Sequence, residues 1–76
     1  MKVWLNSIDK IKKFVEDNSL FNGIVTVIDS NGCAIRGDSI IGMFSLNLLQ
    51  PVDILIQSST QDEINMLMDK YTKYLF

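Results

Sequence analysis

A run of β-branched residues followed by a turn signal most constrains the fold of this 76-residue chain. Residues 23–28 read Gly-Ile-Val-Thr-Val-Ile, a composition that favours a β-strand over a helix. Asn31-Gly32 follows, and this dipeptide tolerates the positive φ angles of a tight hairpin turn. The sequence therefore predicts a β-hairpin in which residues 33–36 form the returning strand.

Helix signals lie on both sides of this hairpin. Ile8, Ile11, Phe14 and Val15 recur at helical spacing and predict a first helix over residues 7–18, capped by Asn6 or Ser7. Residues 39–46 are expected to form a short second helix, capped by Asp38 or Ser39. Thr60 and Glu63 have the capping-box spacing, so a third helix is expected to begin there and to reach about residue 75.

Two further strands complete the predicted fold. Val3 and Leu5 alternate with polar or aromatic neighbours, and a second alternating segment follows Pro51. The result is one α+β domain over residues 1–76, an open-faced two-layer sandwich with the order β-α-β-β-α-β-α. Its four-stranded, mainly antiparallel sheet would carry three helices on one face. The other face, which carries Leu55, is expected to be partly apolar and to favour self-association.

Composition limits the chemistry that the chain can perform. There is no histidine, which removes histidine-based acid–base catalysis, phosphohistidine transfer and nearly every zinc site. Seven basic and nine acidic residues form no basic stripe for nucleic acid, and the apolar runs are too short to span a membrane. A cytoplasmic, non-enzymatic protein without metal or cofactor is expected, with Cys33, Met43, Met66 and Met68 packed in its interior.

Ser39 is the residue best placed for a modification. A hydroxyl at a helix N-cap accepts a backbone N–H, and this structural role alone explains the residue. A phosphoryl group at the same position would face free N–H groups and the positive end of the helix dipole. The neighbouring charge of Asp38 would oppose that group, so the residues alone favour the capping role.

Residues 38–46, Asp-Ser-Ile-Ile-Gly-Met-Phe-Ser-Leu, resemble the regulatory-serine helix of the HPr family. These proteins are small phosphocarriers of the bacterial sugar phosphotransferase system. The resemblance covers about residues 8–75 and includes Phe14-Val15, the strand and Asn-Gly turn of residues 25–32, the strand of residues 52–56 and the last helix. It implies an HPr-like arrangement of the elements.

The chain departs from the family where the phosphocarrier keeps its histidine. The family's Gly-Ile-His-Ala-Arg-Pro loop is shortened here to Leu-Asn-Ser-Ile-Asp-Lys at residues 5–10. Ser7 falls near the histidine position, and Asp9 falls where an arginine would stabilise the phosphoryl group. A carboxylate would repel that group, and phosphoserine is a low-energy ester. The relay chemistry is therefore expected to be lost, with Ser7 serving as a helix cap.

The resemblance also implies a regulatory surface. In HPr proteins and in their histidine-lacking relative Crh, a dedicated kinase phosphorylates the serine at the position of Ser39. Exposed residues after it help to bind partners such as a catabolite-control repressor. By this resemblance Ser39 would be the phosphoacceptor, and Ile40, Ile41, Gly42 and Phe44 would form the partner-binding surface.

Three functions stay open. The chain is expected to be a regulatory or protein-binding module in the control of bacterial sugar transport, with a serine kinase and a transcriptional regulator as partners. One alternative is a phosphocarrier role in the phosphoenolpyruvate-dependent phosphotransferase system. The other is a structural homodimer that associates through the uncovered sheet face, with Trp4 and Leu55 in the interface.

Overall fold

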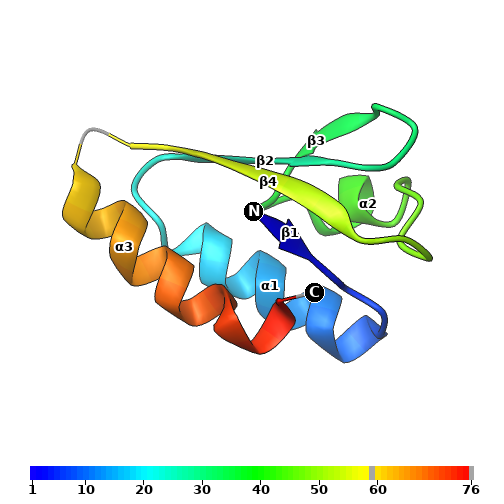
Figure 1. Ribbon diagram of the computed structural model, residues 1–76, viewed down its shortest axis with the longest axis horizontal. Helices are drawn as coiled ribbons and strands as arrows, with labels where there is room; N and C mark the ends of the chain where they lie inside the picture. The colour runs from blue at the N-terminus through cyan, green and yellow to red at the C-terminus, as the bar shows by residue number, and fades with distance from the viewer. Residues whose placement is uncertain (59, 76) are drawn as a thin grey trace.

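A four-stranded antiparallel sheet forms one layer of the molecule, and three helices form the other (Figure 1). The computed structural model describes residues 1–58 and 60–75. The predicted α+β class, with its open antiparallel sheet and three helices, is confirmed. In chain order the described elements are β1 (Lys2–Val3), α1 (Ile8–Ser19), β2 (Ile24–Ile28), β3 (Ala34–Arg36), α2 (Ile40–Met43), β4 (Val52–Gln57), α3 (Gln61–Lys70) and a 3₁₀ helix, η1 (Tyr71–Tyr74).

The strands lie in the order β1-β4-β2-β3, and each neighbouring pair is antiparallel. The register places Thr26 of β2 between Leu55 of β4 and Arg36 of β3. Because side chains alternate along a strand, Val25 and Val27 turn toward the helices and are buried. Leu55 lies on the uncovered face, where 49% of it is exposed.

Three aromatic rings join the helical layer at its centre. The ring of Phe14 in α1 lies 5.0 Å from that of Tyr71 and 5.7 Å from that of Tyr74, measured between centroids. All three residues are at most 2% exposed. Edge-to-face and offset pairs of this kind stabilise a core beyond their buried area. Burial, with the nearby carboxylate of Asp17, raises the pKa of both tyrosines, so their hydroxyls remain protonated donors.

A buried asparagine connects these rings to the segment before α2. Asn18 is 5% exposed, and its Nδ2 donates to the carbonyl oxygen of Gly37 at 2.9 Å. The Tyr71 hydroxyl donates to Asn18 Oδ1. A Cβ atom at Gly37 would lie 2.6 Å from Asn18 Nδ2, so the close approach requires glycine. The same amide therefore links α1, η1 and the start of α2.

The β2–β3 hairpin exists as predicted, but its turn differs from the prediction. A two-residue Asn-Gly turn needs positive φ at both residues. In the described residues only Gly32 has it, at 84°, and the loop runs from Asp29 to Cys33. Asp29 N–H donates to Cys33 O at 3.0 Å, and Gly32 N–H donates to Asp29 O at 3.0 Å. This is the pattern of a longer loop with a glycine bulge.

The observed bounds and caps of the helices differ in part from those predicted from residue spacing. Ser7 caps α1 as predicted, but α2 spans only Ile40–Met43 and not residues 39–46. Thr60 makes no side-chain capping bond. Glu63 instead accepts a hydrogen bond from Ser58 Oγ at 2.8 Å. The third α-helix ends at Lys70 and continues as the 3₁₀ helix η1.

Some residues expected in the interior are exposed. Met43 is buried, but Met66 is 66% and Met68 is 38% exposed, and Cys33 lies in the exposed hairpin loop. The prediction that these three residues lie in the interior is wrong, because Cys33 lies in a loop and Met66 and Met68 flank the buried face of α3 that carries Leu67. Among the described residues, no helix has the length and apolar character needed to cross a membrane.

Replacing Asn18→Leu should lower the free energy of unfolding by about 2–4 kcal/mol, because the buried Gly37 carbonyl and Tyr71 hydroxyl would both lose their partner. Urea denaturation followed by circular dichroism measures the change. Ser19→Ala is the control, since Ser19 is exposed and its hydroxyl bonds only within α1. Equal stability of Asn18→Leu and the wild type would show that the bridge contributes nothing.

Candidate functional site

Ser39 begins α2 and caps it. Its Oγ accepts a hydrogen bond from the Gly42 N–H at 3.1 Å, and the residue is half-buried. The side chain of Asp38 is already paired, because Arg36 donates to its carboxylate through two nitrogens at 3.0 and 3.1 Å. The negative charge beside Ser39 is therefore partly compensated from β3.

Gly42 fits a position where only a small residue has room. An added Cβ would lie 2.6 Å from Ile35 Cγ2 and 2.9 Å from Ser39 Oγ. The absence of a side chain lets α2 pack against β3 and lets the Gly42 N–H reach the Ser39 hydroxyl. Gly42, itself half-buried, thus positions the exposed residues of α2.

The apolar residues of α2 divide between the core and the surface. Met43 is fully buried, whereas Ile41 is 83%, Phe44 is 51% and Ile40 is 36% exposed. A helix of four residues cannot bury every apolar side chain of such a segment, so this excess lies in contact with solvent. These three side chains are among the residues that the resemblance to the HPr helix implied for partner binding.

Phe44 also lines a cavity of about 370 Å³ beside the start of α1. Buried Leu5, Ile11 and Leu46 form its apolar floor. Its walls include Asn6, Ser7 and Leu48, and its rim consists of exposed apolar side chains. These rim residues are Trp4, Ile8, Phe44 and Leu49, between 38% and 86% exposed. We call this rim, together with exposed Ile40 and Ile41, the α2 surface.

Some of the predicted site residues line the cavity, and others do not. It brings Ser7 and Phe44 together, whereas Ser39, Ile40, Ile41, Gly42 and Asp9 do not line it. Sequence reasoning missed Leu48, Leu49 and Ile8 as parts of this site. The signal was the run Leu46-Asn47-Leu48-Leu49, which lies outside every helix and strand and leaves Leu49 86% exposed.

The Ser7 hydroxyl takes part in a hydrogen bond that caps α1. Its Oγ accepts a hydrogen bond from the Lys10 N–H at 3.2 Å, and the Lys10 ammonium donates to Asn6 Oδ1 at 3.0 Å. Asp9 is exposed in the first turn of α1. These contacts explain residues 6–10 as the beginning of a helix.

Asp29 holds the wall of the cavity in place from the hairpin loop. Its Oδ2 accepts from the Asn47 N–H at 3.0 Å, and its Oδ1 accepts from the N–H groups of Asn31 and Cys33. These backbone donors, that of Asn47 first, hold the pKa of the carboxyl below its ordinary value against the effect of desolvation. One carboxylate thereby joins two loops that are separated along the chain.

These features describe an exposed apolar surface around a cavity. Among residues 1–58 and 60–75, no group of three or more histidine, cysteine, aspartate or glutamate side chains could hold a metal ion. Comparison with family models, with curated proteins and with solved structures gave no match to this chain. The function therefore has to be argued from the exposed apolar side chains and their cavity.

Stability should fall in acid partly through Asp29. Its folded-state pKa lies below the ordinary value, so its contribution is fully present above the unfolded pKa and is lost as the pH falls through the folded one. Chemical denaturation between neutral and acid pH should show less loss for Asp29→Asn than for the wild type. At neutral pH, Asn47 amide exchange should be faster in the variant, because one carboxamide oxygen cannot serve both loops. Identical pH profiles would contradict this role of Asp29.

Proposed function

We propose that this protein is a non-enzymatic, HPr-like regulatory module that binds a protein partner through the α2 surface. The observation that carries this proposal is the rim of exposed apolar side chains around a cavity with an apolar floor. Exposed apolar groups lose contact with water when a partner covers them, and this contributes about 25 cal/mol for each Å² removed from solvent. A protein side chain entering the cavity would gain that burial together with shape complementarity.

Phe44 is a bulky aromatic residue at the rim and is therefore suited to the central role in binding. It is half-exposed and lines the cavity, so a partner can contact its ring while the rest of the side chain packs on this protein. Aromatic residues at the centre of an interface commonly carry a large share of the binding energy. Ile41, which is more exposed, would extend the contact along α2.

Regulation by a serine kinase is the second part of the proposal. Ser39 stands at the start of the helix that presents Ile41 and Phe44, so a phosphoryl group there would place negative charge beside the binding surface. The pairing of Asp38 with Arg36 reduces the repulsion that Asp38 alone would exert. The residue string at positions 38–46 and the order of the elements support the relationship to HPr-like proteins.

The phosphocarrier alternative finds less support in the residues at the start of α1. Ser7 uses its hydroxyl to cap the helix, and the nearby acceptor position has no imidazole because the chain contains no histidine. A phosphate ester on serine would not be passed on readily to a sugar-transport protein. We therefore assign the protein to regulation within sugar uptake and catabolite control.

Phe44→Asp should abolish binding to a purified catabolite-control repressor, measured by isothermal titration calorimetry. The matched control is Leu55→Asp, which places the same charge at a residue of similar exposure, 49% against 51%, on the uncovered sheet face. The control should bind like the wild type. Undiminished binding by Phe44→Asp would move the interface away from α2, and no binding by the wild type would overturn the choice of partner.

Incubation with an HPr serine kinase and ATP should add one phosphoryl group, which tandem mass spectrometry should locate at Ser39. Ser39→Ala should remain unmodified. Ser45→Ala should be modified like the wild type, since exposed Ser45 lies on the other side of α2 and donates to Gly42 O. A wild-type protein that takes up no phosphate, or takes it up elsewhere, would refute this part of the proposal.

A further inference from the structure

A second exposed apolar surface lies away from α2, between the end of α1 and one side of α3. A cavity of about 210 Å³ opens here, lined on the α1 side by Leu20 and Phe21 and on the α3 side by Met66 and Leu67. Leu20 is 80% and Met66 is 66% exposed, whereas Leu67 is buried. We call this cavity with its lining residues the α1–α3 groove.

The groove exists because the contact between the two helices is concentrated at one end. Tyr71 and Tyr74 follow α3 and pack on Phe14 of α1, so the last part of the helical layer is closed. Leu67 is the only residue of α3 that is buried. One side of α3 therefore lacks the cover of α1, and Met66 stands at the edge of an unfilled space.

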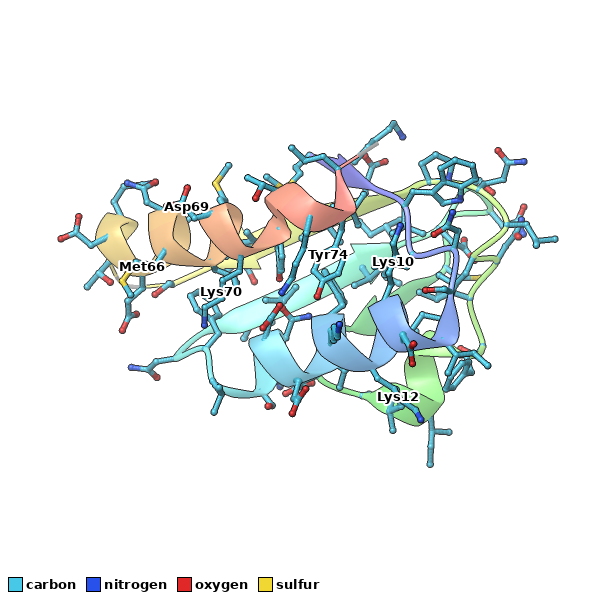
Figure 2. All side chains as sticks on the ribbon, turned by 90° about the horizontal axis from the view of Figure 1, so that it is seen from below. Lys10, Lys12, Met66, Asp69, Lys70 and Tyr74 are labelled. Atoms are coloured by element: carbon cyan, nitrogen blue, oxygen red, sulfur yellow. The ribbon has the colours of Figure 1, made fainter. Side chains whose placement is uncertain are left out.

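Two opposite charges border the groove on α3. Glu63 and Lys70 are separated by seven residues, about two turns, so they lie on one side of the helix about 10 Å apart. Figure 2 shows Met66 and Lys70 on the side of α3 that faces α1, with Asp69 on the other side. Met66 lies between the two charges along the helix.

The two carboxylates that line the groove already have hydrogen-bond partners within the fold. Asp17 accepts a hydrogen bond from the Tyr74 hydroxyl at 3.2 Å and is paired with Lys73 at 3.4 Å. Glu63 uses one oxygen to accept from Ser58. Within the described part of the chain Lys70 has no ion-pair partner. A partner that offered an anion to Lys70 and an apolar side chain to the space beside Met66 would complement both features.

We propose that a second copy of this protein covers the α1–α3 groove with the same surface of its own α3 helix. A two-fold axis near Met66 would set the two α3 helices antiparallel and bring Glu63 of each copy to Lys70 of the other. A parallel arrangement would oppose like charges, so the order of the charges along α3 selects the antiparallel one. The two Met66 side chains would then meet at the axis and fill the grooves, as an isologous interface requires.

This dimer is independent of the proposed regulatory role. In Figure 1 the beginning of α3 lies at the opposite end of the molecule from α2. The α2 surface would stay accessible in the dimer. The interface also differs from one through the uncovered sheet face, which carries Leu55.

Sedimentation velocity over a wide range of protein concentration tests the proposal. The wild type should dimerise, and Met66→Asp should remain a monomer. Leu55→Asp is the control and should dimerise like the wild type, and the circular dichroism of each variant checks its fold. A wild type that stays monomeric, or a dimer that Leu55→Asp and not Met66→Asp dissociates, would overturn the proposal.

A charge swap tests the antiparallel pairing itself. Lys70→Glu alone should raise the dimer dissociation constant about tenfold, because two attractive pairs become repulsive. The double variant Glu63→Lys, Lys70→Glu should regain most of the lost affinity, since the reciprocal pairs are restored with their signs exchanged. A double variant as weak as Lys70→Glu would show that these residues do not meet across the axis.

Discussion

The buried amide of Asn18 is the interaction on which the arrangement of the helical layer depends. It lies in the last turn of α1, accepts from the Tyr71 hydroxyl and donates to the carbonyl oxygen of Gly37. A buried polar group is stable only when its hydrogen bonds are made, so one geometry satisfies all three residues and most alternatives leave one unpaired. The position of the chain at Gly37, two residues before Ser39, is thereby tied to the core.

Asp29 performs a similar task on the other side of α2. Its carboxylate joins the hairpin loop to Asn47, the residue between two lining residues of the larger cavity. The short helix α2 thus stands between two polar anchors, one through Asn18 and one through Asp29. Its own four residues could not hold it in place, because isolated helices of this length are unstable in water. The exposed residues of the α2 surface therefore have a rigid support.

Local sequence signals were enough for much of the fold. The β-branched run of residues 24–28 predicted the hairpin, and Ser7 predicted the beginning of α1, because both depend on neighbours in the chain. The hairpin turn was predicted wrongly because the Asp29 carboxylate accepts from the N–H groups of Asn31 and Cys33, which favours a longer loop than the Asn-Gly pair alone suggests. In the site, Phe44 was assigned to partner binding through the resemblance of residues 38–46 to the HPr helix. Leu49 was missed because only the tertiary fold places it beside Ile8.

Met66 shows how a wrong prediction from spacing points to an interaction. Helical periodicity places apolar residues on one face of α3, and the expectation that such residues are buried holds for Leu67 and Tyr71. Met66 lies outside this face and was also expected in the interior, but it borders the groove, where α1 does not cover α3, and is 66% exposed. A dimer formed through this uncovered part would present two α2 surfaces at opposite ends. A partner with two matching sites could then bind both, and the second contact would form at a high effective concentration. The incomplete cover of α3 would in that way strengthen binding by α2 without any change to the α2 surface itself.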